Sequence, residues 1–148
     1  MITTPPGAYF VTVCTKNRRC LFWDIVGASI ARPQPFRLSA WGEIVDKTIR
    51  EIPSYYAAIT VDRYTVMPNH IHLLLQIQTD SDGRPIVTPT ISTVVQQFKG
   101  AVTKQIGQPV WQKLFYDHVI RNQQDYDEIW KYIDNNPVKW KEDCFYKE

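Results

Sequence analysis

The sequence predicts an α+β fold of the ferredoxin-like type, a βαββαβ sandwich with an antiparallel sheet and one additional C-terminal helix. Short segments rich in β-branched and aromatic residues alternate with longer segments whose apolar residues recur at helical spacing. Their order along the chain is strand, helix, strand, strand, helix, strand, helix. A length of 148 residues suits one domain with its own core, so residues 1–148 are expected to form a single domain.

The first third of the chain predicts a strand, a turn, a loop and a helix. Tyr9–Thr15 is aromatic and β-branched, as strands are, and Lys16–Cys20 is a basic turn. Gly27–Leu38 contains two prolines and little periodicity, which indicates a loop. Ser39 can cap a helix that continues through Ile52, and Pro53 is expected to end it.

The middle of the chain predicts a β-hairpin. Ala57–Val66 and His70–Gln78 each resemble a strand, and Pro68-Asn69 between them is typical of a turn. The polar residues Thr79–Pro89, which include glycine and proline, predict a loop after the hairpin.

The last third predicts two helices with a strand between them. Thr90–Ile106 has apolar residues at helical spacing, and Gly107 is expected to help stop this helix. A fourth strand is expected within Leu114–Arg121. Asp125–Asn136 is the final helix, because Pro137 disfavours helical geometry in the residue before it.

Composition narrows the function classes only a little. The net charge is +2, so charge alone does not indicate nucleic-acid binding, although an aromatic content of 13% is high and aromatic rings can stack on unpaired bases. Cys14, Cys20 and Cys144 form no CxxC pair, which favours reduced thiols and a cytoplasmic protein. No apolar run is long enough to span a membrane, and no secretory leader is expected.

The most informative feature is the histidine pair His70-Ile71-His72. Residues two apart on a strand point the same way, so both imidazoles should leave one face of the sheet. The apolar residues that alternate with them should pack a core on the other face; these are Ile71, Leu73, Leu75 and Ile77. Two neutral imidazoles held side by side on a rigid strand form half of a metal site.

The final helix offers groups that can complete such a site. Its apolar stripe should be the buried face and consists of Tyr126, Ile129, Trp130 and Ile133. Tyr132 lies off the centre of that stripe, and Asn136 shares its side of the helix four residues later. A phenolic oxygen can act as a covalent nucleophile, and an amide oxygen can ligate a hard metal ion.

Each of these residues also has an ordinary structural explanation. A His-x-His pair on a half-exposed strand is more often surface decoration than a metal site, a tyrosine near a helix end usually packs, and an asparagine before proline usually ends a helix. Two patterns of metal-dependent hydrolases fail here, because Leu73-Leu74 stands where one requires Asp-His and Leu74 stands where the other requires a third alternate histidine. A single-strand-binding module without catalysis would have no reason to keep the histidines and Tyr132 together.

Several motifs in order resemble the single-tyrosine HUH transposases, most closely the REP-associated tyrosine transposases. His70-Ile71-His72 is the HUH motif (histidine, hydrophobic residue, histidine), and Val66-Met67-Pro68-Asn69 matches the family's lead-in. Phe98-Lys99 matches a pair on the family's mid-chain helix. A later pattern appears as Trp111, Tyr116, Asp117, His118, Ile120 and Arg121. The catalytic-helix pattern Y-I-x-x-N-P appears as residues 132–137, and the match runs from about residue 9 to residue 140.

The resemblance implies a ferredoxin-like (RRM-like) sheet with the HUH strand at its centre and a C-terminal catalytic helix. It implies a metal-dependent enzyme that cleaves and rejoins single-stranded DNA through a 5′-phosphotyrosine on Tyr132. The DNA is expected to be a hairpin or a palindromic repeat. The implied metal ligands are His70, His72 and Asn136, and the ion is Mg²⁺ or Mn²⁺. Members of the family can be homodimers or monomers, and a domesticated nicking enzyme remains an alternative.

The basic residues expected to contact DNA phosphates are Lys16, Arg18, Arg19, Lys99, Lys104 and Arg121. Such contacts position a strand without selecting its sequence, and each of these residues can equally be solvated surface charge. His118 is either an accessory residue of the site or a hydrogen-bonded structural histidine at a strand end.

Overall fold

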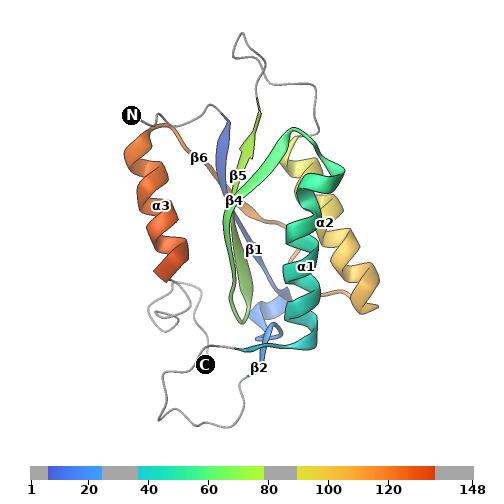
Figure 1. The fold of residues 1–148 in the computed structure, drawn as a ribbon. Helices are drawn as coiled ribbons and strands as arrows, with labels where there is room; N and C mark the ends of the chain where they lie inside the picture. The colour runs from blue at the N-terminus through green and yellow to red at the C-terminus, as the bar shows by residue number, and fades with distance from the viewer. Residues whose placement is uncertain (1–6, 25–36, 79–89, 136–148) are drawn as a thin grey trace.

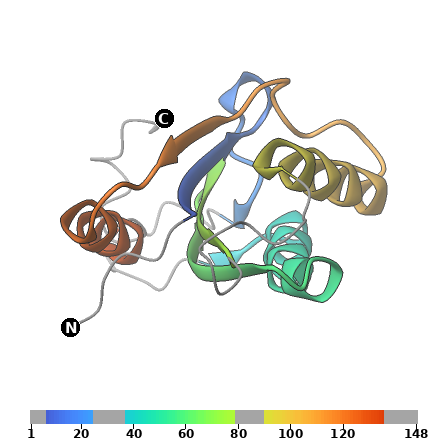
Figure 2. The same cartoon turned by 90° about the horizontal axis from the view of Figure 1, so that it is seen from above.

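A four-stranded antiparallel sheet separates a pair of helices from a third helix (Figures 1 and 2). The computed structural model describes residues 7–24, 37–78 and 90–135. The sheet order is β4-β5-β1-β6, with bounds β1 Ala8–Cys14, β4 Ile59–Val66, β5 His70–Ile77 and β6 Tyr116–Val119. The helices are α1 Ala40–Tyr55, α2 Ile91–Ile106 and α3 Gln123–Asn135. This antiparallel α+β arrangement confirms the predicted ferredoxin-like fold class.

Smaller elements follow β1. The 3-10 turn η1 (Lys16–Arg18) comes directly after it, where a basic turn was expected. Strands β2 (Trp23–Asp24) and β3 (Arg37–Leu38) pair as a short two-stranded sheet. The last two residues of the loop predicted at Gly27–Leu38 are therefore β3, and the rest of that loop lies outside the described residues, as do Asn136 and the loop predicted at residues 79–89.

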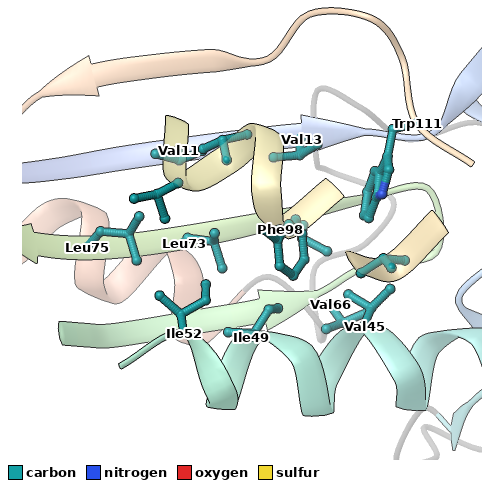
Figure 3. Close-up of a cluster of buried hydrophobic side chains, with 14 of the residues drawn as sticks. Val11, Val13, Val45, Ile49, Ile52, Val66, Leu73, Leu75, Phe98 and Trp111 are labelled. Carbon is teal, nitrogen blue, oxygen red and sulfur yellow. The ribbon is translucent and has the colours of Figure 1, made fainter. Parts of the chain in front are cut away.

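The face that carries α1 and α2 holds the main core (Figure 3). Alternate residues of the central strands point into it, including Val11 and Val13 of β1 and Leu73 and Leu75 of β5. Because the side-chain period of a strand is two, the other residues of β5 face α3. We call these two sides of the sheet the α1/α2 face and the α3 face.

The α3 face has a much smaller apolar cluster, which consists of Ala8, Leu74, Ile120, Ile129 and Ile133. Leu74 is the only β5 residue in it, since His70 and His72 occupy the preceding positions of the same face. The predicted division of β5 into a histidine face and an apolar face is confirmed.

Local chemistry explains where the helices begin. Ser39 caps α1 by accepting a hydrogen bond from the Gly42 N–H at 3.0 Å, and Thr90 caps α2 through the Thr93 N–H at 3.2 Å. The third helix begins at Gln123 rather than at the expected Asp125, because the Asn122 side chain accepts from the Asp125 N–H at 2.8 Å and acts as the cap.

The expectation that Pro53 ends α1 is wrong, because the helix continues to Tyr55. Pro53 cannot donate a hydrogen bond to the Ile49 carbonyl, but it stands in the last turn, so only two residues of the helix follow the lost bond. The Tyr56 N–H still bonds the Ile52 carbonyl at 3.1 Å and closes the helix.

The start of α1 packs tightly on the segment before β2. A Cβ added to Gly42 would overlap the carbonyl oxygen of Phe22. The N–H groups of Leu21 and Phe22 in turn donate to the Pro68 carbonyl at 2.8 and 3.0 Å. Backbone contacts thus connect α1 to the turn that precedes His70.

None of the helices in the described part of the chain is long and apolar enough to cross a membrane.

Candidate active site

The two histidines of the HUH motif face each other on the α3 face of β5. Both are buried, with His70 0% and His72 1% exposed. Their Nε2 atoms are 3.1 Å apart, and their ring centroids are separated by 4.6 Å. Both imidazoles therefore direct the same nitrogen to one point.

The Nδ1 atoms of the pair are held by neighbouring polar side chains. His70 Nδ1 lies 2.7 Å from Asn69 Oδ1. His72 Nδ1 lies 2.8 Å from the hydroxyl of Thr12, which stands opposite His72 in the pairing of β1 with β5. The Asn69 amide is oriented by its Nδ2, which donates to the Arg18 carbonyl at 3.4 Å. Its oxygen must then accept from His70 Nδ1–H, which leaves the lone pair of a neutral imidazole on Nε2.

This pair fits two ligands of a single ion. Two imidazole nitrogens about 2.1 Å from one metal at right angles are about 3.0 Å apart, close to the separation observed here. Hydrogen bonds to the far nitrogen of each ring are the usual outer partners of metal-binding histidines. Within the described residues, no cluster of three or more His, Cys, Asp or Glu side chains could hold a metal. Asn136, the expected third ligand, lies outside them.

Helix α3 brings Tyr132 next to the histidines. The ring centroid of Tyr132 is 5.3 Å from that of His72 and 6.0 Å from that of Phe10, and the side chain is 36% exposed. Phe10 also contacts His72, at 5.1 Å. The structure thus brings the imidazole pair and the Tyr132 ring together within one chain.

A bulge in β4 provides polar anchors for α3. The pairing of β4 with β5 shifts between Val61 and Arg63. Asp62 accepts from the Tyr126 hydroxyl at 2.6 Å, and Arg63 pairs with Asp134 at 3.0 Å. Because a bulge interrupts strict alternation, two adjacent side chains can reach the same helix.

An aromatic ring strengthens this attachment. The Arg63 guanidinium lies 4.7 Å from the centre of the Trp130 ring, within the range of a cation–π contact. Burial, followed by the hydrogen bond to Asp62 and its charge, raises the pKa of Tyr126 well above its usual value. The Tyr126 phenol therefore remains a neutral donor at physiological pH. Sequence reasoning missed Asp62 and Arg63, and the one available signal was a pair of adjacent charges inside a strand.

His118 also contacts α3. Its Nε2 lies 2.7 Å from Asp125 Oδ2, and the histidine side chain is 53% exposed. His118 stands opposite Phe10 in the pairing of β6 with β1. Strand β1 lies between His118 and the HUH strand β5, and this position fits either role expected from the sequence.

The expected DNA-binding residues fall into three places. Lys16, Arg18 and Arg19 are in or next to η1, just beyond Cys14, which pairs with His70. Arg121 is exposed at the opposite end of β1, next to Ile120, whose N–H bonds the Ala8 carbonyl.

Lys99 and Lys104 lie on α2, which covers the other face of the sheet. Lys99 is only 8% exposed, and its ammonium donates to the carbonyls of Gln112 and Lys113 at 2.7 and 3.1 Å. Burial lowers the pKa of Lys99. Of the six basic residues, the structure brings only the three near η1 close to the histidine pair.

Comparison with known proteins assigns the family. The model of the family described as "Transposase IS200 like" matches residues 7–136. The chain belongs to this transposase family. A Haemophilus influenzae protein, provisionally named a REP-associated tyrosine transposase, is 32% identical over 92% of this chain and 73% of its own length. The REP-associated tyrosine transposase of Escherichia coli K12 is 26% identical over 90% of this chain and 67% of its own.

A solved structure shares the fold of this transposase. A REP-associated tyrosine transposase bound to a REP hairpin aligns with a TM-score of 0.65 and 23% identity, over 95% of this chain and 72% of that one. The predicted resemblance to REP-associated tyrosine transposases is therefore confirmed.

Proposed function

We propose that this transposase cleaves and rejoins single-stranded DNA with Tyr132 as the nucleophile. One observation carries the proposal: the Tyr132 ring is 5.3 Å from His72, whose Nε2 is 3.1 Å from that of His70. A phenol and two converging imidazoles are the groups that such a reaction requires, and α3 and β5 hold them together in one chain.

In the proposed step the Tyr132 oxygen attacks the scissile phosphorus. A phosphorus–oxygen bond to the tyrosine forms, the bond to the 3′ oxygen breaks, and the phenolic proton is lost as the 3′ oxygen becomes a hydroxyl. The product is a 5′-phosphotyrosine. Because the ester energy is kept in that bond, a 3′-hydroxyl can attack it and rejoin DNA without ATP.

His70 and His72 would hold a divalent ion, Mg²⁺ or Mn²⁺, with Asn136 as the third protein ligand. A bound ion supplies charge that stabilises the phosphate oxygens as negative charge develops. The chain's own contribution is orientation: Asn69 and Thr12 fix the far side of each imidazole, and the β4 bulge holds α3.

The proposed substrate is a hairpin-forming single strand. The solved relative is bound to a REP hairpin, and the basic residues Lys16, Arg18 and Arg19 lie at the histidine end of β1, where they can contact phosphates. That Arg121, Lys99 and Lys104 contact phosphates stays a prediction. Because Lys99 already bonds two carbonyls, we expect its substitution to affect folding more than DNA affinity.

Covalent capture tests the function. End-labelled DNA hairpins with single-stranded flanks are incubated with the protein and Mn²⁺ and analysed on denaturing gels. We expect a protein–DNA adduct with the native chain and none with Tyr132→Phe. Tyr55→Phe is the matched control, because Tyr55 is 76% exposed and lies on α1, which packs on the face of the sheet opposite α3. A chelator should remove the adduct.

Other outcomes identify the alternatives. Cleavage that survives Tyr132→Phe would indicate a metal-dependent hydrolase. Hairpin binding without cleavage under any metal would indicate a binding module. A second unlabelled strand with a free 3′-hydroxyl separates a transposase from a domesticated nicking enzyme, since only the former yields rejoined products.

A further inference from the structure

Asn69 contacts two parts of the site at once. It is 0% exposed, its Oδ1 lies 2.7 Å from His70 Nδ1, and its Nδ2 donates to the Arg18 carbonyl at 3.4 Å. One amide therefore touches both the imidazole of a candidate metal ligand and the backbone of the basic turn η1. We propose that Asn69 is a positioning residue that couples phosphate binding at η1 to metal binding at His70. This inference rests on the function proposed above.

The turn that Asn69 contacts has an unusual backbone. Asn17 and Arg18 have φ values of 57° and 53°, in the left-handed region that residues with a Cβ rarely adopt. Such a conformation persists only when surrounding contacts determine it, and it is concentrated at functional sites. The turn thus depends on the hydrogen bonds around it, and the Asn69 amide provides one of them.

Thr15 supplies further bonds between the same two segments. Its hydroxyl lies 2.7 Å from the Arg19 carbonyl and 3.1 Å from the Asn69 carbonyl, and its N–H donates to the Asn69 carbonyl at 2.9 Å. Residues 15–19 and residue 69 are therefore tied through both backbone and side chains. A phosphate that binds the basic residues of η1 and shifts this turn would therefore also shift the Asn69 amide that orients His70.

The two ends of the amide have different chemical roles. The oxygen accepts from His70 Nδ1–H and leaves the Nε2 lone pair directed at His72. The Nδ2 group fixes the carbonyl of Arg18, in the turn that carries the exposed Lys16 and is followed by the exposed Arg19. If the two ends act as one unit, DNA should raise metal affinity, and metal should raise DNA affinity by the same factor.

Two substitutions separate the ends. Asn69→Asp keeps an oxygen toward His70 but places an acceptor opposite the Arg18 carbonyl, whereas Asn69→Ala removes both contacts. Mn²⁺ affinity is measured by electron paramagnetic resonance on the protein alone and with a saturating single-stranded oligonucleotide. The ratio of the two dissociation constants is the coupling factor.

In the native protein we expect a coupling factor of about 5 or more. Asn69→Ala should weaken Mn²⁺ binding without DNA by about 10- to 100-fold, as loss of an outer hydrogen-bond partner does. Asn69→Asp should retain Mn²⁺ binding and lower the coupling factor several-fold below the native value, leaving the part that comes from direct contact of the ion with phosphate. Thr15→Val, which leaves the His70 contact intact, should also reduce the coupling factor while Mn²⁺ affinity without DNA stays unchanged.

Defined results would overturn the inference. A native coupling factor of 1 would do so, as would Asn69→Ala protein with native Mn²⁺ affinity. If Asn69→Ala does not fold, as circular dichroism would show, Asn69→Asp and Thr15→Val decide, and native coupling in both contradicts the proposal. These results leave the covalent adduct of the native chain unaffected, whereas absence of that adduct would contradict the proposed function instead.

Discussion

The two faces of the sheet are built by different means. Among the described residues, the main cluster comprises twenty-one buried side chains, most of them between the sheet and α1 or α2, whereas the cluster on the α3 face comprises five. On the α3 face, polar contacts from Asp62, Arg63 and His118 add to this small cluster in attaching the helix. The difference indicates that the α1/α2 face supplies most of the folding free energy, while the α3 face is left to position chemical groups.

This division follows from the sequence of β5. Its positions on the α3 face are used by His70 and His72, so apolar area is lost there that an ordinary sheet would bury. Short-range polar contacts then replace part of the missing packing. Elements with few buried apolar contacts open at lower free energy than the core, so α3 should be the least stable of the three helices.

Core truncations should give the largest effects and test the comparison directly. Ile49 on α1 is 0% exposed and Ile133 on α3 is 1% exposed, so the two offer a matched pair. Ile49→Ala should lower the free energy of unfolding by about 2–5 kcal/mol. Ile133→Ala should cost less in urea denaturation, because α3 can open locally, but it should speed amide exchange along α3. Equal losses with unchanged exchange would show that the faces do not differ.

The Arg63 anchor should have an intermediate effect that appears in function more than in stability. Arg63→Ala removes the Asp134 pair and the contact with Trp130, together worth about 1 kcal/mol at a partly exposed site. Adduct formation should fall several-fold, because Tyr132 is on the loosened helix. Arg50→Ala is the control, since Arg50 pairs with Asp46 at 3.0 Å on α1. A similar fall in both variants would contradict a special role for the bulge.

Alkaline titration should distinguish the faces through two half-buried phenols, those of Tyr64 and Tyr126. Burial, with the hydrogen bond and charge of Asp46, raises the pKa of Tyr64 from 10.0 to about 12. The folded state keeps the proton that the unfolded state loses, so this stabilisation is complete below pH 10.0 and is lost as pH rises toward about 12. Tyr64→Phe should therefore flatten the fall of the urea midpoint across that window.

Tyr126 should behave differently because it anchors α3. Its pKa is also raised, so its contribution likewise disappears at high pH. We expect Tyr126→Phe to change the alkaline dependence of amide exchange in α3 more than that of the urea midpoint. If Tyr126→Phe instead changes the alkaline dependence of the urea midpoint and leaves amide exchange in α3 unchanged, α3 unfolds together with the core.

The smallest effect is expected at the exposed His118–Asp125 pair. His118→Gln should change the free energy of unfolding by about 0.5 kcal/mol or less, as exposed pairs usually do. A large loss of adduct with native stability would instead assign His118 to the chemistry. Asp125→Asn alters the partner and keeps the imidazole. A loss of adduct in His118→Gln alone would assign the effect to the imidazole, and a loss in both variants would assign it to the pair.

Sequence periodicity predicted what depends on local rules. Alternation in β5 placed both histidines on one face, and helical spacing placed Tyr132 off the apolar stripe of α3. It could not predict how close they come, because the docking of α3 depends on the one-residue shift in β4 near Asp62. Lys99 shows the same limit: its carbonyl partners at residues 112 and 113 are set by tertiary packing, which no local pattern encodes.

Gly42, on the α1/α2 face, affects the position of the histidine pair on the α3 face. A methyl group there would displace the Phe22 carbonyl, and the Phe22 N–H is bonded to Pro68, immediately before Asn69. Random mutagenesis scored by DNA processing should therefore recover Gly42 replacements as inactive, although the site is on the far side of the sheet. A design that grafts the β4–β5 hairpin onto another scaffold would need to include Gly42 and the Phe22 backbone that it contacts.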